Sequence, residues 1–305
     1  MLLRRLLTSL LQKRSSDAQV NRADASQTKH VEDLPGFNKL VRARHGLFIA
    51  NKNDVYIGRA LIAYGEFCEL EWRLLNRYCR VGGVIVEVGA NIGGHTVNLA
   101  RAVGPNGRVV AIEPQPIIFQ SLCANLALNC LLNVDALNCG CAESHRTLAL
   151  PRVDYASEGN FGGVSMREQS DASTFQSLVQ PLDDIVDGCP RIDLIKIDVE
   201  GMEQQVLAGA SRTIERFKPT LYVENDRPTR SKALIDAVHG MGYRAWWHIP
   251  PLFNPNNYYE NTENLYPNIC SYNMLCLHAQ SVAHAPPELE EVTEATRHPL
   301  ARSTK

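Results

Sequence analysis

The sequence is organised around Val84-Ile-Val-Glu-Val-Gly-Ala-Asn-Ile-Gly-Gly-His-Thr-Val-Asn-Leu-Ala100. Its first five residues form a β-branched run, which is typical of a strand buried on both faces of a parallel sheet. Its last residues have helical spacing, and Gly89, Gly93 and Gly94 lie between the two parts. A strand, a glycine turn and a helix N-terminus together present backbone N–H groups to a ligand. The stretch therefore predicts a ligand-binding turn.

A carboxylate inside this strand narrows the choice of ligand. An unpaired buried charge is costly, so we expect Glu87 at the carboxyl end of the strand with a cation or a hydrogen-bond donor as partner. S-adenosylmethionine supplies an ammonium group and donors at such a place. The spacing is Glu-x-Gly-x-x-x-Gly, and Asn91 stands where the dinucleotide fingerprint has its second glycine. The pattern thus favours S-adenosylmethionine over a dinucleotide.

The composition excludes several classes of protein. The chain has 305 residues, 45% of them hydrophobic and 21% charged, with a net charge of −2, so no overall field favours nucleic acid. Its nine cysteines are dispersed without a C-x-x-C pair, which argues against a disulfide framework and a zinc ribbon. Reduced cysteines indicate a reducing compartment, and we expect a cytoplasmic location. No apolar segment reaches the roughly 20 residues of a transmembrane span.

The N-terminus carries an amphipathic pattern. Its leucines share one helical face, and basic residues lie opposite; the leucines are at positions 2, 3, 6, 7, 10 and 11. This pattern fits a helix on a membrane surface, which would make the protein membrane-associated. It also fits a transit-like leader or a short helix that docks on its own domain. We interpret residues 1–33 as this leader with a polar linker.

The remainder alternates between strand and helix patterns. Residues 34–80 are expected to form a helical cap with a helix from about Ala60 to Cys79, and 81–280 the main domain, with a β-rich insertion at 140–190. The tail, 281–305, is expected to be disordered. The later strands are predicted at 108–113, 134–139, 192–198, 219–224, 243–248 and 271–277. This alternation predicts an α/β fold with an open, doubly wound, mostly parallel sheet.

Polar residues recur at the predicted carboxyl ends of strands, where such sheets bind ligands. These residues are Glu87, Glu113, Asp198, Glu224 and His248. Glu113 lies 20 residues beyond Gly93, the distance at which a carboxylate accepts hydrogen bonds from both ribose hydroxyls of a nucleoside. The alternative is that Glu113 only caps the helix after Pro114.

Carboxylates gathered at neighbouring strand ends repel one another unless a cation lies among them. Asp198 and Glu200 follow one strand, and Glu224 and Asn225 end the next. The cation is either the sulfonium of the cofactor or Mg²⁺, which prefers oxygen ligands. Asp198, Glu224 and Asn225 are the candidate metal ligands. The alternative is that these groups only bind hydroxyls of a substrate.

Methyl transfer to a hydroxyl requires that the attacking oxygen loses its proton. A general base can take this proton, or a metal can lower the pKa of the hydroxyl. Asp198, Glu200 and His248 are the candidate catalytic residues, with His248 and Glu200 as candidate bases. The alternative for His248 is an aromatic position at the edge of a loop. The segment 246–260 and Tyr266 are rich in aromatic and amide side chains, which suit a sugar ring. The same loop, rigid with prolines, would also serve as a buttress for the sheet.

Four motifs resemble the FkbM family of S-adenosylmethionine-dependent methyltransferases. They are Glu87-Val-Gly-Ala-Asn-Ile-Gly-Gly-His-Thr96, Glu113-Pro114, Pro181-Leu-Asp-Asp-Ile185 and Lys196-Ile-Asp-Val-Glu-Gly-Met-Glu203. The resemblance covers about 60–280 and implies a seven-stranded class I methyltransferase sheet with an antiparallel last strand. It also implies O-methylation, usually of a sugar or polyketide hydroxyl.

The resemblance carries cofactor contact onto Glu87, Gly89, Asn91, Gly93, Thr96 and Glu113, and it marks Asp198 and Glu200 as active-site residues. We add Glu66, early in the predicted helix, as a further cofactor contact. The predicted function is O-methylation of a hydroxyl on a sugar, a glycan or a related metabolite. Two alternatives stay open: an NAD-dependent oxidoreductase, which shares the sheet and the acidic ribose contact, and a non-catalytic binding module.

Overall fold

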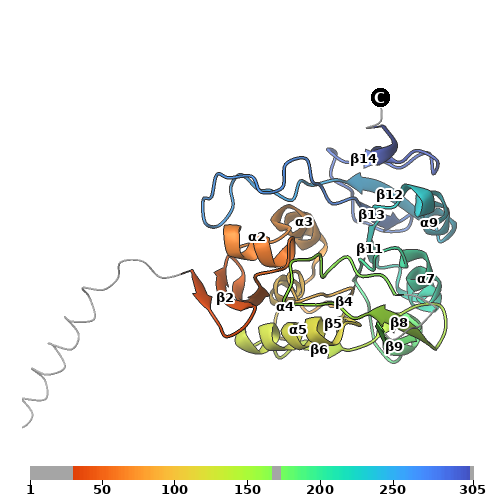
Figure 1. The fold of residues 1–305 in the computed structure, drawn as a ribbon. Helices are drawn as coiled ribbons and strands as arrows, with labels where there is room; N and C mark the ends of the chain where they lie inside the picture. Colours follow the sequence, from red (N-terminus) through yellow and green to blue (C-terminus); the bar gives the residue numbers. More distant parts are fainter. Residues whose placement is uncertain (1–29, 167–172, 303–305) are drawn as a thin grey trace, which may run out of the picture.

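An eight-stranded sheet forms the centre of this computed structural model, which describes residues 30–166 and 173–302 (Figure 1). From one edge to the other, the strands are β14 (Glu290–Glu291), β12 (Tyr243–His248), β13 (Asn273–His278), β11 (Thr220–Glu224), β10 (Leu194–Ile197), β4 (Val84–Val88), β5 (Arg108–Ile112) and β6 (Val134–Leu137). The strands from β11 to β6 are parallel, and β13 is antiparallel to both of its neighbours. The predicted doubly wound sheet with an antiparallel last strand is confirmed, and β14 adds an eighth strand.

Helices cover both faces of this sheet, and β4 shows why. Val86 and Val88 pack into a core with the helices α7 (Glu203–Ala208), α8 (Ser211–Phe217) and α9 (Pro228–Gly240). Ile85 points to the opposite face and packs with α3 (Glu69–Leu75) and α4 (Thr96–Val103). Alternate residues of a strand face opposite sides, so Glu87 shares the face of Ile85. The strand buries both faces and needs apolar residues at nearly every position.

Residues before β4 differ from the predicted helical cap. The strands β1 (Val31–Asp33), β2 (Asn38–Ala43) and β3 (Gly46–Asn51) form an antiparallel sheet of their own. The single helix predicted at 60–79 is two helices, α2 (Ile57–Tyr64) and α3, followed by a 3-10 turn at Asn76–Tyr78. The break lies at Gly65 and Cys68, which have φ angles of 65° and 48°. Both values belong to the left-handed region, which does not continue an α-helix.

The insertion after β6 forms a second small sheet, as predicted. Its strands are β7 (Gly140–Cys141), β9 (Thr174–Gln180) and β8 (Arg146–Pro151), in that order, and α6 (Leu182–Ile185) leads back to the main sheet. The helix predicted from Glu203 to Phe217 is divided into α7 and α8 near Gly209. A Cβ on Gly209 would lie 2.1 Å from the Ala142 carbonyl oxygen, so the main chain of the insertion packs directly on this junction.

The prediction of a disordered tail is wrong for the described part of 281–302. Glu290 and Glu291 pair with β12, and the backbone N–H of Val292 donates to the Ala245 carbonyl at 2.8 Å. Further along, His298 Nε2 lies 2.8 Å from the carbonyl oxygen of Asn225. The tail is held because Val292 also packs into the core that β12 and α9 form. The main domain therefore extends beyond residue 280.

The leucine-rich leader lies outside the described residues. Among the helices that the structure describes, none is long and apolar enough to cross a membrane. The nine cysteines are all free.

We predict that Val292→Asp destabilises the protein by about 3 kcal/mol, because Val292 is only 4% exposed and packs in the core beside Tyr243 and Trp247. Thermal unfolding followed by circular dichroism measures the effect. The exposed Val282→Asp is the matched control and should leave the midpoint unchanged. An unchanged midpoint for Val292→Asp would show that the tail is not part of the folded domain.

Candidate active site

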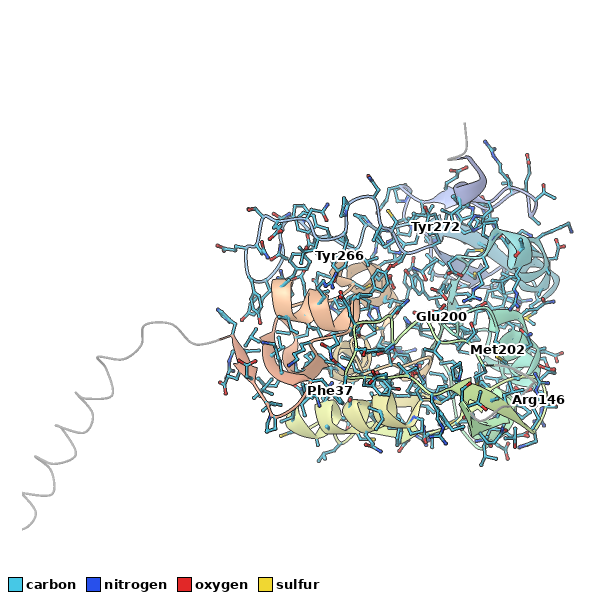
Figure 2. All side chains as sticks on the ribbon, in the orientation of Figure 1. Phe37, Arg146, Glu200, Met202, Tyr266 and Tyr272 are labelled. Atoms are coloured by element: carbon cyan, nitrogen blue, oxygen red, sulfur yellow. The ribbon has the colours of Figure 1, made fainter. Side chains whose placement is uncertain are left out.

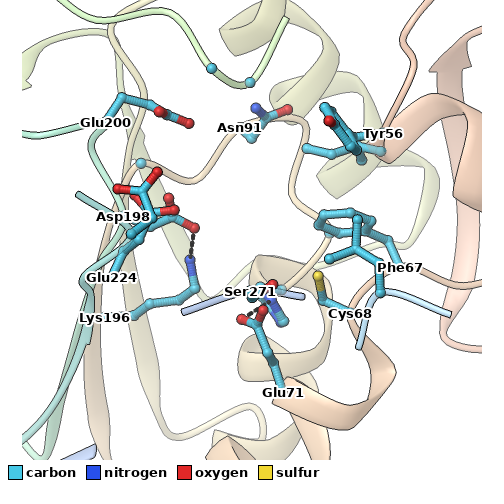
Figure 3. A pocket seen from close by; sticks show the side chains of 18 of the residues that line it. Tyr56, Phe67, Cys68, Glu71, Asn91, Lys196, Asp198, Glu200, Glu224 and Ser271 are labelled. Atoms are coloured by element: carbon cyan, nitrogen blue, oxygen red, sulfur yellow. Dashed lines mark hydrogen bonds and ion pairs between the residues drawn. The ribbon is translucent and has the colours of Figure 1, made fainter. Parts of the chain in front are cut away.

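A cavity of about 310 Å³ lies at the carboxyl ends of β4, β5, β10 and β11. Figure 3 shows its two walls. The strand-end carboxylates of Asp198, Glu200 and Glu224 line one side, and Tyr56, Phe67 and Cys68 line the other, which comes from the segment around α2 and α3. Asn91 in the glycine turn lies between these walls.

The glycine turn brings β4 directly against the end of β10. Gly89 has a φ of 86°, and a Cβ there would lie 1.8 Å from the Asp198 carbonyl oxygen, so only glycine fits. Asn91 also has a left-handed φ, of 50°, and its backbone N–H donates to Glu113 Oε2 at 2.9 Å. Gly89, Asn91 and Glu113 all line the cavity, as the sequence predicts.

Glu113 follows β5 and is held by the main chain. Its two carboxylate oxygens accept backbone N–H groups from Asn91 and Gln115, both at 2.9 Å. Burial raises the pKa of Glu113 to about 7, although these two hydrogen bonds act in the opposite direction. Each oxygen keeps a further lone pair for a ligand. The carboxylate is therefore fixed in orientation and still able to accept two more hydrogen bonds.

Two of the predicted cofactor contacts lie behind the cavity. Thr96 is fully buried in α4, and its hydroxyl donates to Glu87 Oε2 at 2.6 Å. Gly93 faces the core, where a Cβ would lie 2.9 Å from Leu122 Cδ1. Neither residue lines the cavity, whereas Glu87, Gly94 and His95 do. Gly93 and Thr96 thus shape the turn and hold Glu87, and their contact with the cofactor stays a prediction.

Glu66, a further predicted cofactor contact, has its partners elsewhere in the fold. Its carboxylate accepts hydrogen bonds from Arg44 Nε at 2.7 Å, Asn254 Nδ2 at 2.7 Å and the Tyr258 backbone N–H at 2.9 Å. Glu66 is buried and does not line the cavity. Its charge is satisfied by these partners, so it ties the loop after β12 to the turn between β2 and β3.

The acidic cluster consists of Asp198, Glu200 and Glu224, whose carboxylate oxygens lie within 4.8 Å of one another. Lys196 Nζ lies 3.0 Å from Asp198, and Arg227 Nη2 lies 2.8 Å from Glu200. Glu224 Oε2 is buried and has no hydrogen-bond partner among the described residues.

Burial and the neighbouring carboxylates raise the pKa values of two members of this cluster. The pKa of Glu200 rises to about 7, and that of Glu224 rises well above its usual range. Two of the three carboxylates thus have a basic partner in the fold, whereas burial and the neighbouring carboxylates disfavour the ionised form of Glu224.

Asn225 and His248 lie away from this cluster. The Asn225 side chain is buried and donates to Ser231 Oγ at 2.9 Å, so it faces α9 and is not a ligand in the cluster. His248 Nδ1 lies 2.7 Å from the Tyr222 hydroxyl, and His248 does not line the cavity. The reason is the strand order: β13 lies between β12 and β11, so Asn273 stands between His248 and Glu224 in the register.

Several charged residues of the cavity were not predicted. Lys196 is 2% exposed in the middle of β10, and Glu71 and His95 are buried at the start of α3 and α4. Lys196 could have been predicted from the sequence, because it interrupts the apolar run of β10 as Glu87 interrupts that of β4. Glu71 had none, because its place depends on the break between α2 and α3.

The aromatic loop after β12 packs mainly against α2. Tyr266 is buried and lies beside α2 (Figure 2). Its ring packs on Tyr56 and Tyr64. The ends of the loop reach the cavity, with Leu252 on one side and the segment 269–272 on the other. The loop thus lines the cavity at its ends, and its contact with a substrate stays a prediction.

Residues 87–245 match the methyltransferase FkbM domain. The chain belongs to the FkbM methyltransferase family. Methyltransferase sdnD of Sordaria araneosa is 30% identical over 186 residues, which are 50% of this chain and 70% of that protein. Methyltransferase 1 of Beauveria bassiana is 30% identical over 143 residues, which are 41% of this chain and 57% of that protein.

Among solved structures, the methyltransferase FkbM of Methylobacillus flagellatus is 24% identical, with a TM-score of 0.42. The match covers 63% of this chain and 43% of that chain. This chain thus spans less than two thirds of the crystallised protein and of the Beauveria relative.

The protein is accordingly an enzyme of the methyltransferase class, and its sheet is the Rossmann-like sheet of class I methyltransferases. The oxidoreductase and the non-catalytic module that the sequence left open are set aside by this membership.

We predict that Glu66→Gln destabilises this FkbM-family enzyme by about 2 kcal/mol, because it weakens the charge-assisted hydrogen bond to Arg44. It should leave the affinity for S-adenosylhomocysteine unchanged. Differential scanning calorimetry and titration calorimetry measure the two quantities. A loss of affinity without a loss of stability would restore Glu66 as a cofactor ligand.

Proposed function

We propose that the enzyme binds S-adenosylmethionine across the cavity and transfers its methyl group to a hydroxyl of the acceptor. The observation that carries the proposal is the placement of Glu113. Its buried carboxylate lines both the main cavity and a narrower cavity of about 40 Å³ beside it. A nucleoside whose ribose lies at Glu113 extends into both.

The narrower cavity suits the adenine ring. Its apolar side chains come from the ends of β5 and β6, from the insertion and from the turn after β10; they include Ile112, Cys139, Cys141, Met166 and Val199. Glu113, Gln115 and Asp198 add polar groups to the same walls. A flat aromatic base gains from burial between the apolar side chains. The ribose hydroxyls then donate to the free lone pairs of Glu113. The sulfur end of the cofactor points towards the acidic cluster.

We predict that the affinity for S-adenosylhomocysteine falls about tenfold from pH 8 to pH 6. The ionised carboxylate of Glu113 accepts both ribose hydroxyls, and its pKa is raised to about 7 by burial, so lowering the pH protonates it and removes an acceptor. Titration calorimetry at several pH values measures this slope. The Glu113→Gln variant should bind S-adenosylhomocysteine more weakly, and its affinity should not depend on pH. The same pH dependence in the variant as in the wild type would contradict the ribose contact.

The walls of the cavity indicate the class of acceptor. Tyr56, Phe67 and Leu252 present apolar surface, and the acidic cluster faces it. Such a pair of walls fits a molecule with an apolar face and hydroxyl groups, as a sugar ring has. We infer that a hydroxyl on a sugar, a glycan or a related metabolite donates to Asp198, which takes its proton as the oxygen attacks the methyl carbon. Glu200 lies beside this path, and alignment of the two reactants supplies most of the rate.

We predict that Asp198→Asn lowers methyl transfer at least about 100-fold and changes the affinity for S-adenosylhomocysteine little, because the amide cannot take up a proton. Transfer of a tritiated methyl group to sugars, glycans and polyketide hydroxyls provides the assay. His248→Asn is the matched control, since His248 does not line the cavity. Full activity of Asp198→Asn with any accepted substrate would remove Asp198 from the mechanism.

A divalent cation is the second candidate for the acidic cluster, because Glu224 Oε2 is buried there without a partner among the described residues. Glu200 then replaces Asn225 in the ligand set with Asp198 and Glu224. Three carboxylates fit Mg²⁺, which would lower the pKa of the acceptor hydroxyl when bound. The same tritium assay, run with EDTA and then with added Mg²⁺, distinguishes the two candidates: a loss that Mg²⁺ restores identifies a cation.

A further inference from the structure

We propose that Glu71, His95 and Lys196 form a subsite for a zwitterion, the α-amino carboxylate end of the cofactor. This inference rests on the proposed function, since it takes the cofactor to be S-adenosylmethionine. The three residues come from α3, from the N-cap of α4 and from β10, and they meet at the end of the cavity away from the narrow adenine cavity. Glu71 lies outside the region that matches the family domain.

The charges of this subsite have both signs and are deeply buried. Glu71 and Lys196 are 4% and 2% exposed, and both line the cavity. Figure 3 shows them on the same side of the cavity, below Asp198. Burying such charges is costly unless each finds a partner of opposite sign. A ligand end that carries one ammonium and one carboxylate supplies both partners at once.

Glu71 is prepared to accept the ammonium group. Its Oε2 lies 3.4 Å from His95 Nε2, and a hydrogen bond with Ser271 adds a further contact. Burial alone would raise the pKa of Glu71, but His95, Lys196 and Ser271 together lower it to about 2. The carboxylate is therefore ionised throughout the working range of pH. It supplements Glu87, one of whose oxygens is already bonded to Thr96.

The carboxylate of the ligand has the Lys196 ammonium as a donor nearby. His95 Nδ1 is a second donor in the doubly protonated form of the ring, because Nε2–H already faces the Glu71 carboxylate. His95 Nδ1 is buried and has no hydrogen-bond partner among the described residues, although His95 lines the cavity. A buried ring nitrogen without a partner is uncommon in folded proteins and indicates a missing ligand or water. Lys196 adds a buried ammonium on the same side, already 3.0 Å from Asp198.

A metal ion is the competing occupant. Cys68, Glu71 and His95 have potential ligand atoms within 4.8 Å of one another, and sulfur, oxygen and nitrogen ligands suit Zn²⁺. The zwitterion is favoured because Lys196 brings a positive charge close to Glu71, and because burial and Glu71 raise the pKa of the Cys68 thiol well above its usual range, which disfavours the thiolate that zinc needs.

Two compounds related to the cofactor test the subsite in binding experiments that need no acceptor. S-adenosylhomocysteine carries the α-amino carboxylate, and methylthioadenosine lacks it. We expect Glu71→Gln to lower the affinity for S-adenosylhomocysteine about 10- to 100-fold, because a charged hydrogen-bond partner is lost. The affinity for methylthioadenosine should change less than about threefold. His95→Ala should give the same selective loss. Titration calorimetry on the full chain measures both ligands.

Glu69→Gln is the matched control. Glu69 is buried on the same helix but bonds to His45 and Arg73 and does not line the cavity. It should lower the melting temperature without changing the ratio of the two affinities. An equal loss for both ligands in Glu71→Gln, or no loss for either, overturns the proposal. So does a wild-type affinity that falls after dialysis against a zinc chelator, because that result assigns the cluster to a metal.

A wild-type protein that binds neither ligand would overturn the proposed function itself, and the subsite with it. Binding of both ligands by the wild type, with an unchanged affinity ratio in Glu71→Gln, would overturn the subsite alone. The two failures are therefore distinguishable.

Discussion

Glu87 on β4 and Lys196 on β10 occupy paired positions in two neighbouring strands at the centre of a buried sheet. Burial raises the pKa of Glu87, and Lys196 counteracts that rise. The carboxylates of Asp198, Glu87 and Glu71 in turn keep Lys196 protonated against its own burial. Each charge thus reduces the cost of burying the other. A shift of one residue would place both charges in the apolar layer on the other face, so the pair helps to fix the register of the sheet.

This register determines the geometry of the active site. With Val88 opposite Ile197, the next residues of the two chains, Gly89 and Asp198, lie side by side as both strands end. The approach is so close that a Cβ on Gly89 would overlap the Asp198 carbonyl. The glycine turn and Asp198, to which we assign the cofactor and the acceptor, are therefore parts of one packed junction. Positioning of the two reactants, which methyl transfer requires, follows from the sheet itself.

The sequence predicted the central strands, Glu87, Gly89, Asn91 and Glu113 because their signals are local: apolar runs, a glycine turn and a carboxylate at a fixed distance. It could not predict which polar residues after β10 and β11 face the cavity. Glu200 has a left-handed φ of 58°, a conformation that few non-glycine residues adopt, whereas Asn225 turns towards Ser231. The polar composition of the tail predicts disorder. The pairing of the tail with β12, which places Val292 in the core, depends on the tertiary structure. Glu71 could not be predicted because the break between α2 and α3, which no sequence pattern indicates, brings α3 to the cavity.

In the reaction that we propose, Lys196 connects the two reactants. Its ammonium is bonded to Asp198, to which we assign the acceptor, and is attracted to Glu71 and Glu87, to which we assign the cofactor. During methyl transfer the sulfonium loses its positive charge while the acceptor hydroxyl releases a proton, so the total charge of the cavity is unchanged if Asp198 takes that proton. Protonation of Asp198 removes one of the three anions around Lys196, at the moment when the cofactor also becomes less positive. The two changes offset each other, so the net charge next to the buried Lys196 ammonium stays the same.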